Sequence, residues 1–324
     1  MSRYAADLAA IRAAAERLAG VAHRTPVATC TALDVRAGRR VFFKCEQLQK
    51  VGAFKFRGAW NAVSQLPEEV AARGVVTHSS GNHGQALALA ASLRDIPAHV
   101  VVPSNATRAK QEAIAGYGAR VIPCEPRLDA REEMAARVLA ETGGTLIPPY
   151  DHPDVIAGQG TAALELLDEV PDLDAVVAPI GGGGLLSGTV LALREQSPRV
   201  RVFGAEPTGA DDAARSHAAG RRIPPDPPDT IADGLLAGLG EHTWPPIRDG
   251  VEAVWTVPDA DTVAAMRLCW ERAKLLIEPS AAVAVAAVLS ERFRALDGIA
   301  RVGVILSGGN LDLDRLPWGS PEPA

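Results

Sequence analysis

Short β-branched apolar runs alternate along the chain with longer segments in which Ala and Leu recur at helical spacing. The apolar runs predict buried strands at 41–44, 75–77, 98–102, 175–180, 200–205 and 302–306. The longer segments predict helices at 85–94, 128–141, 161–169, 261–276 and 281–293. Because strands that alternate with helices pair in parallel through crossovers, the pattern predicts an α/β fold with parallel sheets covered by helices.

Composition narrows the class of protein and of partner. With 324 residues, of which 47% are hydrophobic and 22% charged, the chain is long enough for roughly two domains with apolar cores. This balance excludes disordered and fibrous proteins. The net charge is −6, from 33 basic and 39 acidic residues, and the basic residues form no block. A small-molecule partner is therefore favoured over a nucleic acid.

The cysteines and the two terminal segments indicate in which cellular compartment the protein works. The cysteines lie far apart, without the short spacings of zinc sites or disulfide frameworks: Cys30, Cys45, Cys124 and Cys269. Charged residues interrupt the first twenty positions, and the longest uncharged apolar stretch near the C-terminus, 279–290, is too short to cross a bilayer. The sequence predicts a cytoplasmic protein with no membrane partner.

Candidate chemistry begins at Lys55, which lies between two phenylalanines in the segment GAFKFRGA, 52–59. A lysine in an apolar pocket has a lowered pKa, and its neutral amine can form a Schiff base. A lysine whose amine reaches solvent from an amphipathic helix explains this segment equally well. The neighbouring motifs must decide between the two interpretations.

The segment THSSGNHGQ, 77–85, joins a predicted strand to a predicted helix. The N–H groups at a helix N-terminus, together with short hydroxyl and amide side chains, bind anions such as carboxylates. A simple helix-capping turn explains Ser80 and Asn82. It does not explain so many polar side chains in one turn, and an anion site is favoured.

Two glycine-rich turns follow other predicted strands. The four glycines at 181–184 allow a nest of backbone N–H groups around a phosphate, but neither the Lys-Ser/Thr of a P-loop nor the G-x-G-x-x-G spacing is present. This favours a phosphate that belongs to a cofactor. The segment SGGN, 307–310, delivers the hydroxyl of Ser307 to a strand end, where α/β sheets bind ligands. Alone, it is an ordinary glycine turn.

Together these four segments resemble the fold-type II pyridoxal-phosphate enzymes, in particular the serine racemase and serine/threonine dehydratase branch. Further matches are EQLQ at 46–49, IAGQGT at 156–161, TIADG at 230–234 and IEPS at 277–280. The resemblance implies a two-domain fold like that of the tryptophan synthase β subunit. Residues 1–70 and 148–324 would form the large cofactor-binding domain, and 71–147 a small mobile domain.

The resemblance also implies a cofactor site. Lys55 would hold pyridoxal 5'-phosphate covalently and then act as the base at the substrate Cα. Phe54 would pack on the cofactor ring, Asn82 would bind the ring hydroxyl, and Ser307 would face the pyridine nitrogen. The phosphate would lie on the backbone of Gly181, Gly182, Gly183 and Gly184.

A substrate site follows by the same resemblance. Ser79, Ser80, Asn82 and His83 would hold the carboxylate of an amino acid. Ser80 would also exchange the Cα proton on the face opposite to the lysine. Arg131 matches a family arginine near the substrate, where it would meet the second carboxylate of 3-hydroxyaspartate. It is equally well explained as a helix-surface charge.

A divalent cation site is implied in the segment AEPTGADD, 205–212. The carboxylates of Glu206 and Asp212 and the carbonyl of Ala210 are hard oxygen ligands, which suit Mg²⁺, Ca²⁺ or Mn²⁺. A solvated acidic loop is the alternative interpretation. The family context favours the metal.

The expected activity is dehydration of L-serine or L-threonine to a 2-oxo acid and ammonia, accompanied by racemisation of serine, in a homodimer. Serine racemisation as the main activity and dehydration of threo-3-hydroxyaspartate are the close alternatives. A synthase that replaces the β-substituent would need a second nucleophile. A non-catalytic homologue would have lost Lys55 or part of the cofactor site, and the chain retains both.

Overall fold

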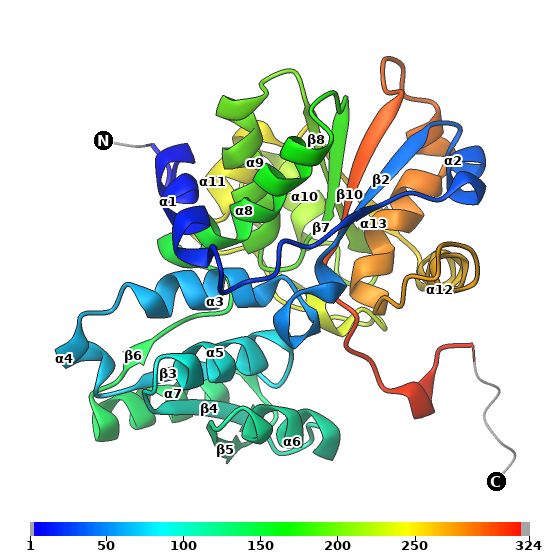
Figure 1. Ribbon diagram of the computed structural model, residues 1–324. Helices are drawn as coiled ribbons and strands as arrows, with labels where there is room; N and C mark the ends of the chain where they lie inside the picture. The colour runs from blue at the N-terminus through cyan, green and yellow to red at the C-terminus, as the bar shows by residue number, and fades with distance from the viewer. Residues whose placement is uncertain (1–2, 319–324) are drawn as a thin grey trace, which may run out of the picture.

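The computed structural model describes residues 3–318, which form two parallel-type sheets at opposite ends of the molecule (Figure 1). In the six-stranded sheet, β1 is antiparallel to β2 and the other pairs are parallel. Its order is β1 (Val27–Ala28), β2 (Arg40–Cys45), β10 (Arg301–Leu306), β7 (Ala175–Pro179), β8 (Arg201–Pro207) and β9 (Ala253–Val257). The four-stranded sheet is parallel throughout, in the order β5 (Arg120–Cys124), β4 (Ala98–Pro103), β3 (Val75–His78) and β6 (Thr145–Leu146).

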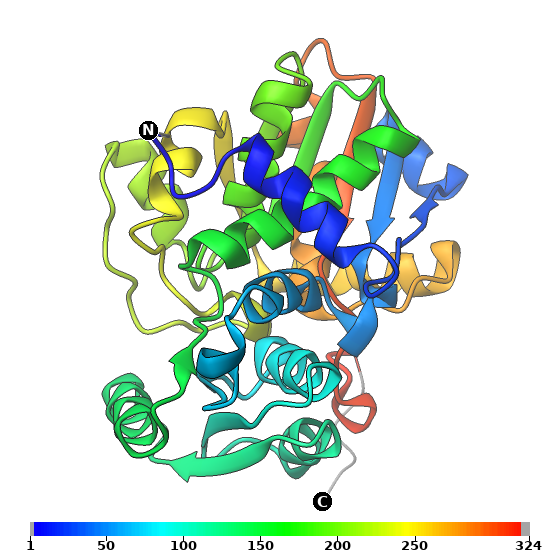
Figure 2. The ribbon, with the colours of Figure 1, turned by 60° about the vertical axis from the view of Figure 1, so that its left-hand side comes forward.

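Helices cover both faces of the six-stranded sheet. One apolar cluster joins the sheet to α1 (Leu8–Leu18), α8 (Pro153–Glu169) and α9 (Gly184–Gln196), which lie in front of it in Figure 2. A second cluster on the other face includes α2 (Thr31–Ala37), α12 (Asp259–Leu268) and α13 (Pro279–Leu289). This sheet is therefore buried on both sides, as parallel sheets usually are.

The four-stranded sheet is covered in the same way. Helices α5 (Asn82–Leu93) and α6 (Arg108–Gly116) pack on one face, and α7 (Leu128–Thr142) packs on the other. Helix α3 (Lys55–Ser64) packs against both α5 and α8, so it lies between the two sheets. The lysine singled out by the sequence is the first residue of this helix.

Several short elements complete the described chain. They are α4 (Glu68–Ala71), α10 (Asp212–Ala219), α11 (Trp244–Gly250), α14 (Glu291–Arg294), the 3₁₀ helices η1 (Glu46–Leu48), η2 (Lys50–Gly52), η3 (Asp233–Leu235) and η5 (Leu313–Arg315), and the π-helical turn η4 (Cys269–Ala273). Within residues 3–318, no helix combines the length and the apolar character that crossing a membrane requires.

The predicted α/β class is confirmed, and each of the six predicted strands is present within two residues of its expected ends. The helix ends are less accurate. The helix predicted at 261–276 is wrong in its last part: α12 gives way to η4, and Lys274 adopts a left-handed conformation with φ 59° that stops helical winding.

Two other helix predictions differ for local reasons. The helix predicted at 161–169 begins earlier, because His152 caps it and Pro153 occupies its first turn. The helix predicted at 281–293 is two helices, since Ser290 is extended and its hydroxyl accepts a hydrogen bond from the N–H of Phe293 at the start of α14. In both cases the helix boundary depends on one capping side chain.

Candidate active site

Lys55 lies at the N-terminus of α3, between the two sheets. Its Nζ donates a hydrogen bond of 2.7 Å to the carbonyl of Pro149 and lies 5.1 Å from the ring centroid of Phe54. Burial lowers the pKa of this amine to about 8, and the nearby Glu278 opposes the shift. The interpretation of Lys55 as a solvent-reaching surface lysine is therefore wrong: its amine is held inside the protein and is neutral in part near pH 7.

A buried ion cluster anchors the opposite side of α3. Arg57, two residues beyond Lys55, binds Glu46 and Glu165 with N–O distances of 2.7 Å each, and Lys44 binds Glu165 at 2.7 Å. The side chains of Arg57, Glu46 and Lys44 are fully buried. These pairs join α3 to η1 and α8, which fixes the helix that carries the lysine.

The end of β10 lies directly beside the lysine segment. The N–H of Phe54 donates to the carbonyl of Ser307 at 3.0 Å, and Ala53 forms an isolated antiparallel bridge with Gly308. Ser307 is 3% exposed. The structure thus brings the SGGN turn and the lysine segment together, although they are about 250 positions apart in the sequence.

Asn82, at the start of α5, takes part in a polar network at the same place. Its Nδ2 donates to both carboxylate oxygens of Glu278, at 3.0 and 3.2 Å, and its Oδ1 accepts from Asn310 Nδ2 at 2.8 Å. The backbone N–H of Asn310 donates to Glu278 Oε2 at 3.0 Å. Sequence reasoning included Glu278 and Asn310 in the quoted motifs but gave neither a role.

The four glycines form the turn between β7 and α9. Gly183 has φ +89°, and α9 begins at Gly184. Within residues 3–318, no acceptor takes the N–H groups of Gly182, Gly183 and Gly184. A Cβ on Gly182 would lie 2.4 Å from the ring of Tyr150. Unpaired amides at the start of a helix, here one of 13 residues, are an arrangement that can bind an anion.

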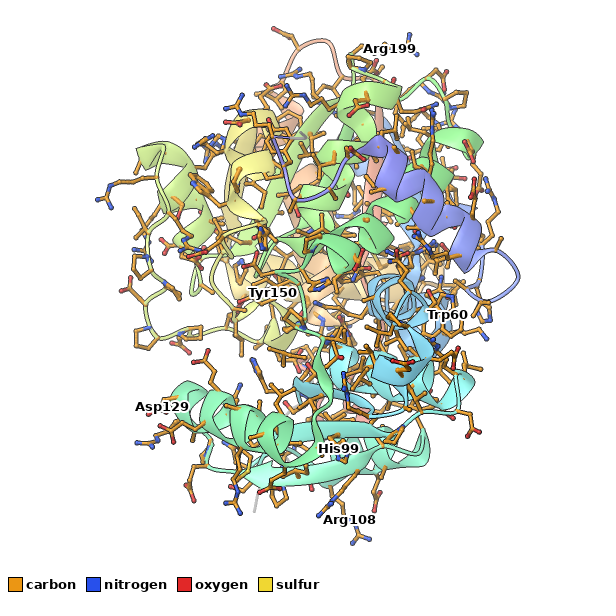
Figure 3. The ribbon with its side chains drawn as sticks, turned by 90° about the vertical axis from the view of Figure 1, so that its left-hand side faces the viewer. Trp60, His99, Arg108, Asp129, Tyr150 and Arg199 are labelled. Atoms are coloured by element: carbon orange, nitrogen blue, oxygen red, sulfur yellow. The ribbon has the colours of Figure 1, made fainter. Side chains whose placement is uncertain are left out.

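Tyr150 is a neighbour of the site that sequence reasoning missed. Figure 3 shows it where the chain passes between the two sheets, and its ring packs against the turn that holds the four glycines. Its hydroxyl has no hydrogen-bond partner in the described part of the chain. Burial and nearby acidic groups raise its pKa, so the phenol stays protonated at neutral pH and can donate a hydrogen bond.

The residues predicted to bind the substrate carboxylate differ in whether their polar groups are already hydrogen-bonded within the protein. Ser80 is half-buried, and its hydroxyl has no partner among residues 3–318, whereas the hydroxyl of Ser79 accepts from the N–H of Gly81 at 3.3 Å. The His83 ring is hydrogen-bonded to the carbonyl of Ile147 at 3.0 Å, and burial lowers its pKa to about 3. Nε2 of the neutral ring therefore donates to that carbonyl, and Nδ1, which is buried without a partner in the described chain, can then only accept a hydrogen bond. The backbone N–H of His83 is the donor left for a carboxylate.

Arg131 lies on α7, the helix that packs on one face of the four-stranded sheet. Its Nε is buried and has no partner among the described residues. Its charge contributes to lowering the pKa of His78, at the end of β3. An unpaired buried guanidinium nitrogen is unusual for a helix-surface charge. Within residues 3–318, no hydrogen bond or ion pair joins Arg131 to Lys55 or Ser80.

The predicted cation ligands lie where β8 leads into α10: Glu206 is in the last part of β8, Ala210 is in the turn and Asp212 is the first residue of α10. The Glu206 carboxylate accepts from the N–H groups of Ala213 and Ala214, at 3.2 and 2.5 Å, and Asp212 Oδ2 accepts from Leu239 at 3.3 Å. Glu206 and Asp212 are 1% and 4% exposed, so the interpretation as a solvated acidic loop is wrong for these two carboxylates. In the described ranges, no group of three His, Cys, Asp or Glu side chains is arranged to hold a metal.

The comparisons with known proteins agree on one family. The family model described as "Pyridoxal-phosphate dependent enzyme" matches residues 18–308. Serine racemase of Arabidopsis thaliana is 50% identical over 98% of this chain and 97% of its own. The beta-hydroxyaspartate dehydratase of Paracoccus denitrificans is 51% identical over 94% and 96%.

Solved structures agree with these relatives. The structure of maize serine racemase matches with a TM-score of 0.95 and 48% identity, covering 96% of this chain and 95% of that one. The structure of a threonine deaminase from T.th. matches with a TM-score of 0.89 and 42% identity, covering 94% of this chain and 99% of that one. Because both matches extend over nearly the whole chain, the likeness includes both sheets and the helix between them.

Proposed function

The chain belongs to the pyridoxal-phosphate dependent enzyme family, and we propose that it is an ammonia-lyase for hydroxy amino acids. It converts L-serine or L-threonine to a 2-oxo acid and ammonia, with racemisation of serine as a second activity. The observation that carries the proposal is the buried amine of Lys55, whose pKa is about 8 and which lies beside the end of β10.

The residues at the site fit the cofactor. Lys55 provides an amine for covalent attachment, and the free N–H groups of Gly182, Gly183 and Gly184 provide a place for the phosphate. When bound, pyridoxal phosphate supplies the electron sink that stabilises negative charge at the substrate Cα. Asn82 and Ser307 would bind its ring through an amide and a hydroxyl.

The chain's own residues would then move the protons. Lys55 takes the proton from the substrate Cα as a general base. Ser307 would present a neutral hydroxyl to the cofactor ring. A hydroxyl, unlike a carboxylate, would not stabilise a charged ring nitrogen, so the electron sink would be weaker and prompt loss of the β-hydroxyl would be favoured. Ser80, whose hydroxyl is free of partners among residues 3–318, returns a proton to the other face and so produces the opposite enantiomer.

A panel of substrates tests this proposal. The purified, cofactor-loaded enzyme with Mg²⁺ is assayed on L-serine, D-serine, L-threonine and L-threo-3-hydroxyaspartate, with both keto acid release and chiral inversion followed. Keto acid from L-serine or L-threonine as the main product supports the lyase. Inversion of serine without keto acid would make the enzyme a racemase, and no turnover of any of the four would reject the proposal.

Dehydration of 3-hydroxyaspartate is a second candidate because one observation favours it. Arg131 has a buried Nε without a partner in the described chain, and a second substrate carboxylate would satisfy that nitrogen. The 51% identity to a beta-hydroxyaspartate dehydratase supports the same substrate. In the panel, a kcat/KM for L-threo-3-hydroxyaspartate well above that for L-serine would establish this candidate as the main activity.

The pKa of Lys55 predicts how cofactor uptake depends on pH. With a pKa of about 8, roughly a tenth of the amine is neutral at pH 7, and only the neutral form attacks an aldehyde. The rate of covalent uptake by the apoprotein should therefore rise about tenfold per pH unit below pH 8 and level off above it. Stopped-flow absorbance measures this rate. A tenfold rise that continued beyond pH 9 would indicate an ordinary exposed lysine.

We also propose a divalent cation at Glu206, Asp212 and the carbonyl of Ala210. Addition of Mg²⁺ should raise the melting temperature of the native protein by several degrees, since an ion that binds only the folded state stabilises it. Glu206→Gln should lose this response. Glu112→Gln removes a carboxylate on α6 that is 62% exposed and serves as the matched control, which keeps the response. An equal response to Mg²⁺ in Glu206→Gln would contradict the site.

The proposal also covers the domains, the oligomeric state and the cellular location of the enzyme. Residues 71–147 would move as a small domain against a large domain of 1–70 and 148–324, which would close the site around the substrate. We propose that the enzyme is a homodimer and works in the cytoplasm. The free thiols of Cys30, Cys45, Cys124 and Cys269 support a reducing compartment.

A further inference from the structure

We propose that Glu278 is a positioning residue that fixes the amide of Asn82 in one orientation and thereby sets how Asn82 meets the cofactor. The inference rests on the proposed assignment of Asn82 to the cofactor ring. It concerns a carboxylate that is 3% exposed and that lies just before α13.

The hydrogen bonds around Asn82 specify its orientation. A carboxylate accepts and does not donate, so Glu278 selects the Nδ2 end of the amide, which lies 3.0 and 3.2 Å from its oxygens. At the other end, Oδ1 accepts from Asn310 Nδ2 at 2.8 Å. A flipped amide would place an N–H against the Asn310 donor and an oxygen against the carboxylate, so both contacts exclude the flip.

The network leaves part of Asn82 free. An amide NH₂ has two hydrogens and an amide oxygen has two lone pairs. Glu278 takes one hydrogen and Asn310 uses one lone pair, and in the described chain no other group binds this side chain. One N–H and one lone pair of known orientation are therefore left for a ligand such as an aromatic hydroxyl.

The backbone around the network leaves room for these side chains. A Cβ on Gly308 would lie 2.7 Å from Glu278 Oε1, and a Cβ on Gly52, which has φ +68°, would lie 2.7 Å from Asn310 Oδ1. Asn310 Nδ2 also donates to the carbonyl of Val51 at 2.6 Å. These two glycines of the lysine and SGGN segments are thus required by the network itself, independently of any bound ligand.

The hydrogen-bond partners of the Glu278 carboxylate are all donors. It accepts from Asn82 and from the backbone N–H of Asn310, and no side-chain acceptor within residues 3–318 pairs with it. Burial raises the pKa of Glu278 to about 8, and the nearby Asp233 adds to this rise. The hydrogen bonds from Asn82 and Asn310 lower the pKa, as does Lys110, which pairs with Asp233 at 2.6 Å. The ionised form is the one that these hydrogen bonds satisfy.

Glu278→Gln tests the inference because it keeps the size of the side chain and adds an N–H that must face the donors. We expect it to weaken equilibrium binding of pyridoxal phosphate to the apoprotein roughly tenfold, the effect of a disturbed buried hydrogen bond to a charged group. Cofactor fluorescence measures this without turnover. Asn82→Ala should weaken binding by a similar factor, and the double variant should be no weaker than either single one.

The possible outcomes distinguish failure of the proposed cofactor site from failure of the positioning role of Glu278. If Asn82→Ala leaves cofactor binding unchanged, the proposed site assignment fails. If Asn82→Ala weakens cofactor binding but Glu278→Gln does not, only the positioning role is overturned. The same holds if the double variant loses affinity by the product of the two single effects. Melting of each apoprotein monitors folding, with the half-exposed Glu271→Gln as the matched control. If the Glu278→Gln protein does not fold, Asn310→Ala takes its place, because it removes the other contact to Asn82. Asn310→Ala must then weaken cofactor binding for the inference to stand.

Discussion

Lys55→Ala is expected to abolish both keto acid release and serine inversion, with a fall in kcat/KM of more than about 10⁴-fold. The lysine would be both the point of cofactor attachment and the base at the substrate Cα, and loss of a general base alone costs typically 10²–10⁴-fold. Lys44, a second buried lysine near α3, is paired with Glu165 and is not free to replace it.

The control for Lys55→Ala is Lys50→Ala. Lys50 lies five positions earlier, and its Nζ is 5.8 Å from the ring centroid of Phe56, outside the proposed site. The Lys50 variant should bind the cofactor and turn over normally. Both proteins are dialysed, and their cofactor absorption and keto acid release are then measured. Turnover retained by Lys55→Ala would contradict the assignment of the lysine.

Ser80→Ala is expected to separate the two activities. If Ser80 moves the proton on the face opposite to Lys55, inversion of serine should fall about 10²- to 10³-fold, while dehydration of L-serine changes only a few-fold. The hydroxyl has no partner among residues 3–318, so its removal leaves no buried polar group unsatisfied. A direct effect on folding is therefore not expected.

The ratio of the two activities serves as the internal control for Ser80→Ala. Chiral chromatography measures inversion, and a coupled assay measures keto acid in the same reaction. A parallel fall in both activities would show that Ser80 only binds substrate. Elimination from D-serine should fall together with inversion, since it begins with proton removal on the face assigned to Ser80.

The fold could be predicted because its signals are local and repetitive. A buried parallel strand such as β7 reads as a short run of Ala and Val, and the following glycine turn marks its end. Helix ends depend on single residues whose conformation is decided by packing. Lys274 carries no stop signal, and a serine such as Ser290 also occurs inside helices, which explains why both predicted helices are too long.

The site was only partly predictable, and the reason is sequence distance. Lys55, Asn82 and Ser307 belong to recognisable segments, so the sequence indicates each one. The Arg57–Glu165 pair spans 108 positions and the Asn82–Glu278 contact spans 196, and no local pattern indicates such partners. Buried charges of this kind become visible only when the two sheets are assembled.

The structure adds reasons for the glycines at 181–184 that the sequence does not show. The sequence explains residues 181–184 by a bound phosphate. In the fold, Gly182 is in addition required by the ring of Tyr150, and Gly183 by its φ of +89°. Tyr150 itself lies in a proline-rich segment with no motif, and a sequence pattern could not have identified it as part of the site.

The most direct test of the account is to locate the bound cofactor on the chain. The enzyme loaded with pyridoxal phosphate is reduced with borohydride, which makes the bond to the protein permanent, and its peptides are analysed by mass spectrometry. The account predicts one modified residue, Lys55, in the peptide that contains AFKFR. Modification of Lys50 or Lys110 instead, or no modification, would contradict it.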